Sequence, residues 1–199
     1  MMTVTEFLDN SYTAFHACEN AAKMLDEAGF TRVSLGAPLS LKPGSKHYVV
    51  KNDSALVAFR VGSLGSYGFN VVASHTDSPC LHVKGNALLS CREGKRLNVE
   101  EYGGLVMYSM LDIPLRIAGR AVYENGGELT AKTVASEALF NIPGQAIHQN
   151  REVNDKCGFN TQTDMLPLVG DAEDAYSLVG GGNIADADLY AVPAVKAYR

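Results

Sequence analysis

GFNVVASHTDSP, residues 68–79, joins a short apolar run to a polar segment. The run at residues 68–73 is mostly apolar and predicts a short buried strand. The polar residues 74–78 follow it directly. Because active sites of α/β sheets gather at the carboxyl ends of strands, the sequence predicts that its chemistry lies at residues 74–78.

His75 and Asp77 are the candidate site residues of this segment. On an extended backbone, residues two apart point to the same side, so the imidazole and the carboxylate share a face. A metal-ligating histidine needs its other ring nitrogen held by an acceptor, and a carboxylate does this well. The residues alone leave two interpretations open, a metal ligand with its orienting partner and a polar turn that bonds to itself.

Cys80 offers a second kind of chemistry, as a nucleophile with His75 or His82 as its base. The sequence around it matches no local signature of a cysteine enzyme, and cysteine is common as a small buried residue. The alternation of apolar and polar residues at 81–84 predicts that His82 lies with Lys84 on a solvent-facing strand surface.

The remaining polar residues do not form a recognised motif. From its own surroundings, His148 is an ordinary loop or strand-end histidine. The paired acids Glu100–Glu101 and Glu152 with Asp155 are typical of solvated surface. No Gly-x-Ser-x-Gly elbow and no phosphate loop are found, which disfavours a serine hydrolase and a nucleotide-binding enzyme.

Composition and charge narrow the class of protein. The chain has 199 residues, of which 46% are hydrophobic and 20% are charged, as in soluble globular proteins. A net charge of -5, with no stripe of basic residues, argues against nucleic-acid binding. Apolar runs fall short of the roughly 20 residues that cross a membrane, and the N-terminus lacks the pattern of a secretory signal.

The four cysteines are widely spaced and include no Cys-x-x-Cys pair, so we expect reduced thiols in a cytoplasmic protein rather than a zinc knuckle. They are Cys18, Cys80, Cys91 and Cys157.

Periodicity predicts an α/β N-terminal part and a β-rich remainder. Residues 5–29 read as one helix, and Asn52-Asp53 predicts the turn of a β-hairpin. From about residue 81, short apolar runs alternate with glycine turns and predict many short strands. The last of these is expected at residues 188–192.

Motifs spread along the chain resemble the aspartyl aminopeptidase family of two-zinc metallopeptidases. The segments that carry the resemblance are Ser11-Tyr12-Thr13-Ala14-Phe15-His16, Leu25–Phe30, Ser74–Leu81, Tyr102-Gly103-Gly104, Leu111-Asp112, Pro114-Leu115, Ala118-Gly119-Arg120, Ile142-Pro143, Ala146-Ile147-His148, Arg151–Asn154 and Phe159-Asn160. Three positions depart from the family pattern: Tyr12 replaces a proline, His82 replaces an arginine, and Ile113 stands where arginine is usual.

The resemblance implies a partial α/β/α metallopeptidase core, followed by an inserted β-rich lid or dimerisation domain. Residues 1–86 would be the first part of the catalytic domain and residues 87–190 the inserted domain. At residues 191–199 the chain would begin to return to the catalytic domain. It also implies that His75 binds zinc, that Asp77 acts in catalysis by orienting it, and that His148 contacts substrate in a neighbouring subunit.

The activity implied is removal of N-terminal acidic or neutral residues from peptides with two Zn²⁺ ions per active site. Relatives form homo-oligomers, commonly dodecamers built from dimers. The family's other metal ligands and its general base would lie beyond residue 199, so we expect this chain alone to be inactive and to expose an apolar face. The alternative is a non-catalytic oligomerisation or interaction module derived from such an enzyme.

Overall fold

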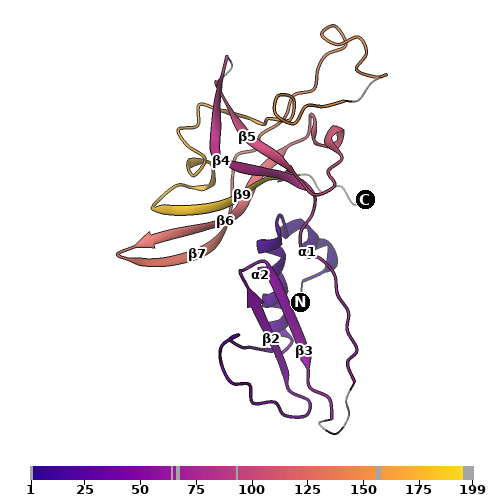
Figure 1. Cartoon of the computed structure of the whole chain (residues 1–199), viewed down its shortest axis with the longest axis vertical. Helices are drawn as coiled ribbons and strands as arrows, with labels where there is room; N and C mark the ends of the chain where they lie inside the picture. Colours follow the sequence, from indigo (N-terminus) through magenta and orange to yellow (C-terminus); the bar gives the residue numbers. More distant parts are fainter. Residues whose placement is uncertain (1, 64, 66–67, 93, 156–157, 195–199) are drawn as a thin grey trace. The chain divides into compact units, whose positions relative to one another are not determined.

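The computed structural model describes residues 2–63, 65, 68–92, 94–155 and 158–194. The chain divides into two compact units, Met1–Asp77 and Ser78–Arg199. The first is a small α/β unit and the second is β-rich, so the predicted fold class is confirmed in both parts (Figure 1).

The first unit begins with two helices, α1 (Val4–Asn10) and α2 (Ala14–Glu27), so the prediction of one helix over residues 5–29 is wrong. Thr3 and Glu6 form a capping box that starts α1. Thr13 is extended, with φ -137° and ψ 171°, and its hydroxyl oxygen lies 2.9 Å from Nδ1 of His16. At the end of α1, the side-chain amide of Asn20 on α2 donates to the backbone oxygen of Asn10 at 3.0 Å and satisfies one of the carbonyl groups that a helix end leaves unpaired.

The rest of the first unit is a three-stranded sheet formed by β1 (Thr31–Arg32), β2 (Lys46–Lys51) and β3 (Ala55–Arg60), in the order β1-β2-β3. The predicted hairpin is confirmed. Asn52 and Asp53 have φ of 53° and 57°, which asparagine and aspartate tolerate better than other non-glycine residues. Tyr48 is buried, and its hydroxyl donates to Oδ1 of Asp26 on α2 at 2.8 Å.

The prediction of a buried strand at residues 68–73 is wrong. These residues form no strand and are exposed, with Phe69 at 93%, Val71 at 78% and Val72 at 101% of full accessibility. In the described part of the chain, β3 pairs only with β2, and no strand pairs with residues 68–73. Within the described residues, the run therefore has no strand to pair with, and its side chains are exposed.

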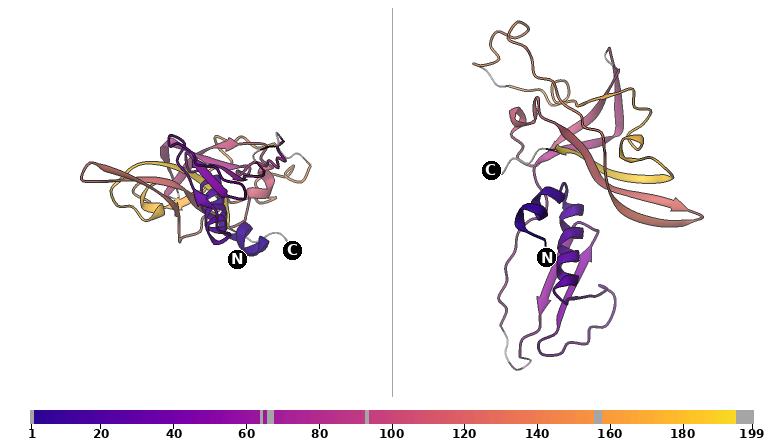
Figure 2. Two further views of the ribbon diagram at one scale, coloured as in Figure 1. Left: turned by 90° about the horizontal axis from the view of Figure 1, so that it is seen from below. Right: turned by 180° about the vertical axis from the view of Figure 1, so that it is seen from behind.

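The second unit is built on an antiparallel six-stranded sheet with the order β7-β6-β9-β4-β5-β8. The yellow strand near the end of the chain lies beside the long hairpin of residues 115–135 in Figure 2. Its strands are β4 (Cys80–Cys91), β5 (Gly94–Tyr102), β6 (Leu115–Asn125), β7 (Glu128–Ala135), β8 (Leu168–Gly170) and β9 (Ile184–Pro193). Two 3₁₀ helices, η1 (Met107–Met110) and η2 (Ser177–Val179), lie between strands. The β-rich character and the final strand were predicted correctly, but β4, β5, β6, β7 and β9 have 8 to 12 residues and are longer than the short strands expected.

The core of the second unit lies where β4, β6 and β9 meet. Leu81, Ile117 and Ala191 are fully buried there. Gly119 is required at the centre of this region because a Cβ on it would lie 1.9 Å from the carbonyl oxygen of Asp188. Strands β6 and β9 can therefore pair closely only when this position is glycine.

The division between the units falls at Asp77 and Ser78, whereas the sequence placed a boundary after residue 86, which lies within β4. The assignment of residues 1–86, 87–190 and 191–199 to catalytic and inserted domains stays a prediction. Residues 195–199 lie outside the described residues.

Candidate metal centre

His75 and Asp77 lie together at the end of the first unit. Nδ1 of His75 is 2.8 Å from the backbone oxygen of Asp77 and 3.2 Å from its Oδ1. Since a carbonyl oxygen only accepts, Nδ1 carries the hydrogen of this bond. In the neutral ring, Nε2 is then the nitrogen with a lone pair, and a metal ligand needs such a nitrogen.

Thr76 fastens this segment to the rest of the first unit. Its Oγ1 donates to the backbone oxygen of Ser54 at 2.8 Å, just after the β2–β3 turn. Thr76 also hydrogen-bonds with the thiol of Cys18 on α2, although burial raises the pKa of that thiol overall. Because Thr76 bonds inward, His75 and Asp77 project together on the other side, as the two-residue spacing predicts.

His75 suits zinc as one ligand. Its side chain is 79% exposed, and imidazole nitrogen is a common zinc donor. A zinc site needs at least three protein ligands. Among the described residues, no group of three or more histidine, cysteine, aspartate or glutamate side chains could hold a metal. The described residues therefore do not form a complete metal site by themselves.

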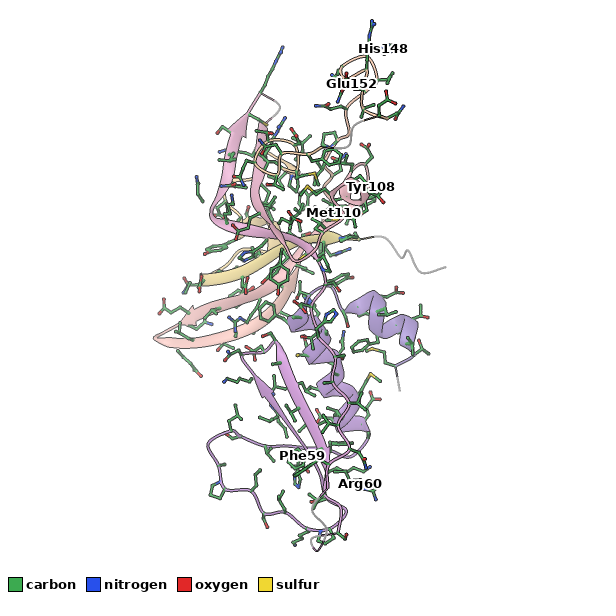
Figure 3. The ribbon with its side chains drawn as sticks, turned by 45° about the vertical axis from the view of Figure 1, so that its right-hand side comes forward. Phe59, Arg60, Tyr108, Met110, His148 and Glu152 are labelled. Atoms are coloured by element: carbon green, nitrogen blue, oxygen red, sulfur yellow. The ribbon has the colours of Figure 1, made fainter. Side chains whose placement is uncertain are left out.

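His148 belongs to the second unit, in a turn that follows Ile142–Pro143 (Figure 3). It is exposed, as are its neighbours Ile147 and Gln149. Nearby, the side-chain amide of Asn150 donates to Oε1 of Gln145 at 3.1 Å and shapes this loop. The location agrees with the expected loop histidine, and its role toward substrate stays a prediction.

His82 has partners that the sequence did not predict. Its Nδ1 lies 3.3 Å from Oε1 of Glu100, its Nε2 lies 3.0 Å from Oδ1 of Asp188, and its ring packs on Tyr190 at 4.8 Å between centroids. Burial, followed by the charge of Asp188, raises the pKa of the Tyr190 hydroxyl. Because each ring nitrogen faces a different carboxylate, His82 ties three strands together rather than standing free on a solvent-facing surface.

The cluster around His82 could not be found from local sequence. Glu100 and Tyr190 reach His82 through the pairings of β4 with β5 and with β9, and the second of these joins residues 108 positions apart. Cys80, the other candidate beside it, is buried and fits the prediction of a small core residue.

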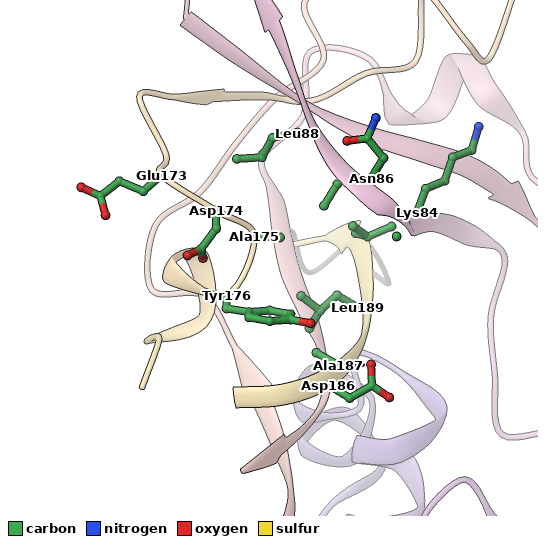
Figure 4. Close-up of a pocket in the computed structure, with 13 residues that line it drawn as sticks. Lys84, Asn86, Leu88, Glu173, Asp174, Ala175, Tyr176, Asp186, Ala187 and Leu189 are labelled. Atoms are coloured by element: carbon green, nitrogen blue, oxygen red, sulfur yellow. Dashed lines mark hydrogen bonds between the residues drawn. The ribbon is translucent and has the colours of Figure 1, made fainter. Parts of the chain in front are cut away.

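A groove of about 390 Å³ opens in the second unit between β4, β9 and the turn before η2 (Figure 4). The bulge of β4 after Val83 forms one wall, and Asp174 and Asp186 lie along the other. None of the predicted site residues His75, Asp77 and His148 lines it. Asp174 is already engaged, because its Oδ1 accepts from the backbone N–H of Ser177 at 2.7 Å.

A small α/β unit followed by a β-rich unit agrees with the fold class predicted for part of a metallopeptidase. Residues 7–183 match the family model described as Aminopeptidase I zinc metalloprotease (M18). The chain belongs to this family.

Relatives that are similar in sequence carry the name of the same family. The chain is 35% identical over 177 residues to a probable M18 family aminopeptidase 2 of Clostridium novyi, covering 86% of this chain and 41% of the relative. It is also 35% identical over 167 residues to a protein of the same name from Azotobacter vinelandii, covering 82% of this chain and 39% of the relative. The chain thus spans about two fifths of the length of these relatives.

Solved structures share the fold. A chain from the structure of an Ape4 and Nbr1 complex superposes with a TM-score of 0.88 at 28% identity, covering 98% of this chain and 44% of that one. The M18 aminopeptidase of Thermotoga maritima gives 0.76 at 24% identity, covering 96% and 46%. A mature Ape1 dodecamer of S. cerevisiae gives 0.75 at 22%, covering 96% and 47%. The last two show likeness of fold alone.

Among the described residues, no helix has both the length and the apolar character that crossing a membrane requires.

Proposed function

We propose that this chain is the part of a zinc aminopeptidase that supplies His75 as a metal ligand and Asp77 as the residue that orients it. The observation that carries this proposal is the bond of 2.8 Å between Nδ1 of His75 and the backbone oxygen of Asp77, in a chain of an aminopeptidase family. The carboxylate beside the same nitrogen adds a second acceptor and makes the ring a stronger donor.

The complete enzyme would hold two Zn²⁺ ions and release N-terminal acidic or neutral residues from peptides. Bound zinc polarises the scissile carbonyl and activates water. The contribution of this chain is to hold the His75 ring in one tautomer, with Thr76 anchored to Ser54 so that the pair keeps its position. The name of the matching family, which describes a zinc metalloprotease, supports the choice of metal.

We further propose that these 199 residues alone do not hydrolyse peptides. The described residues hold no third donor side chain near His75 and Asp77, so a bound zinc ion would lack the ligands that a catalytic site needs.

The test is an assay of the purified chain with added zinc and either aspartyl or leucyl p-nitroanilide, beside a His75→Ala variant. We expect both proteins to release nitroaniline at the rate of the buffer blank. Turnover by the unsubstituted chain above that of His75→Ala would contradict the proposal, because it would require a complete site within these residues.

The proposed enzyme is a homo-oligomer, with dimers that build a dodecamer and with His148 contacting substrate in a neighbouring subunit. The S. cerevisiae structure that shares the fold is that of a dodecamer, which supports assembly. The proposed location is the cytoplasm, in line with the described cysteines Cys18, Cys80 and Cys91, which form no disulfide; Cys157 lies outside the described residues.

The second candidate function is a non-catalytic interaction module. The exposed apolar residues Phe69, Val71 and Val72 favour it, because they offer a surface for another chain. Reading the coding DNA past Arg199 separates the two candidates. A continuing frame with further acidic and histidine ligands favours the enzyme, and a stop codon favours the module.

A further inference from the structure

Strand β7 is the outermost strand of the described sheet in the second unit and pairs only with β6. The register of these two strands is regular over all pairs from Ala118↔Ala135 to Asn125↔Glu128, without a bulge. Residues 128–132 are exposed. Natural edge strands are usually protected from pairing with another chain by a proline, a bulge, a covering segment or charged side chains. As far as the structure describes the chain, β7 has no proline and no bulge, but it carries the charged residues Glu128 and Lys132, so we expect it to pair only with a strand that offers the opposite charges.

The hairpin turn determines which backbone groups of β7 face outward. Gly126 and Gly127 have φ of 62° and 86°, and they form a two-residue connection between the paired residues Asn125 and Glu128. In such a turn the two residues that flank it, Asn125 and Glu128, form a hydrogen-bonded pair. Along the two strands, hydrogen-bonded pairs then alternate with pairs that are not hydrogen-bonded to each other. Residues 129 and 131 therefore present their N–H and C=O groups to the free edge.

The side chains of β7 are complementary to a reversed copy of themselves. Glu128, Thr130 and Lys132 share one face, since they alternate along the strand. In an antiparallel pairing of two β7 strands centred on Thr130, Glu128 lies opposite Lys132 of the second copy, twice. This register also places Leu129 of one copy opposite Ala131 of the other. The outward N–H and C=O groups of these two residues can then hydrogen-bond with each other.

Lys132 is already held on that face. Its Nζ lies 5.6 Å from the ring centroid of Tyr123, the residue that pairs with Thr130 on β6. An ammonium group that is ordered before association loses less freedom when it meets a carboxylate on the second copy.

We propose that two copies of this chain associate by antiparallel pairing of their β7 strands about a two-fold axis at Thr130, with Glu128 of each copy facing Lys132 of the other. The interface is isologous, as most homodimer interfaces are. The proposal rests on the self-association proposed above and is independent of the peptidase activity.

Charge reversal tests the pairing. Glu128→Lys places lysine opposite lysine twice, and Lys132→Glu places acid opposite acid. Since either variant replaces two attractive cross-strand charge pairs by two repulsive ones, we expect it to raise the dimer dissociation constant about tenfold. The double variant Glu128→Lys/Lys132→Glu restores opposite charges and should return the constant to that of the unsubstituted chain. Glu173→Lys, at an exposed acid outside the strand, is the matched control.

Cysteine cross-linking tests the register. At the two-fold position the strands form a non-hydrogen-bonded pair, in which Cα atoms lie about 4.5 Å apart, so Thr130→Cys should form an intermolecular disulfide under mild oxidation. Ala131→Cys faces Leu129 of the second copy instead and should not. The unsubstituted chain, with its four cysteines, sets the background.

The measurements are sedimentation velocity over a range of concentrations and non-reducing electrophoresis. Weakening by both single variants, rescue by the double variant and a disulfide only from Thr130→Cys would support the pairing. The pairing would be overturned if both charge-reversal variants kept the dissociation constant of the unsubstituted chain. It would also be overturned by a disulfide from Ala131→Cys but not from Thr130→Cys. Either result would mean that the chain associates through another surface. A chain that stays monomeric throughout would overturn both the pairing and the proposed self-association.

Discussion

Nδ1 of His75 lies 2.8 Å from the backbone oxygen of Asp77, closer than to the carboxylate oxygen of the same residue at 3.2 Å. The backbone contact, which any residue at position 77 could make, therefore determines the tautomer. We expect ¹⁵N NMR at a pH of about 8.5 to show the hydrogen of His75 on Nδ1. This tautomer should persist in Asp77→Ala. A ring protonated mainly on Nε2 would mean that Nε2 has no lone pair for a metal.

Thr76 anchors the site segment through its hydroxyl. Replacing it by valine removes the bonds to Ser54 and Cys18 while keeping the branched shape. We expect Thr76→Val to lower the free energy of unfolding by about 1 kcal/mol, measured by urea denaturation. Thr31→Val, at an exposed position of β1 in the same unit, is the control. If both variants lose the same stability, the anchoring bonds contribute nothing.

His16 makes the first unit sensitive to acid. Burial lowers the pKa of its imidazole from the ordinary value near 6.5, so the unfolded chain takes up a proton before the folded chain does. Stability is therefore complete above about pH 6.5 and decreases as the pH falls below it. We expect His16→Gln to reduce the loss of unfolding free energy between about pH 7.5 and 5.5. An unchanged loss in this variant would assign the acid sensitivity to other groups.

Gly119 allows the close pairing of β6 with β9. A methyl group there would lie 1.9 Å from the backbone oxygen of Asp188, a contact that only movement of the backbone can relieve. We expect Gly119→Ala to destabilise the second unit by about 3 kcal/mol or more in thermal or chemical denaturation. Gly85→Ala, whose Cβ would meet nothing within 4 Å, should be close to neutral. Equal stability of the two variants would contradict the packing described for β6 and β9.

Sequence patterns predicted those features that depend only on residues close together in the chain. The hairpin at Asn52-Asp53 was found because these two residues tolerate positive φ. His75 and Asp77 lie together, as their two-residue spacing predicts, and their roles at a metal stay predictions. The helix break at Ser11–Thr13 was missed because the apolar spacing continues across it, and because the Asn20 amide that binds the end of α1 lies ten residues further along the chain.

Long-range pairing was beyond local patterns. The apolar run at residues 68–73 is a good strand by composition, yet a strand also needs a neighbour, and none is described beside it. In the same way, the cluster of His82 with Glu100 and Asp188 depends on strand pairings that no short window of sequence contains. The resemblance to a family, rather than physics at single residues, indicated the metal.

The most direct test of the central claim joins this chain to the part of the Clostridium novyi aminopeptidase that it does not match. The measurement is the rate of zinc-dependent release of aspartate or leucine from the p-nitroanilides. The fusion and its His75→Ala variant are compared after circular dichroism has shown that they are equally folded. If His75 is a zinc ligand, the fusion should turn over substrate and His75→Ala should lose activity about 100-fold or more, together with bound zinc. A His75→Ala fusion that keeps its zinc and its turnover would contradict the account.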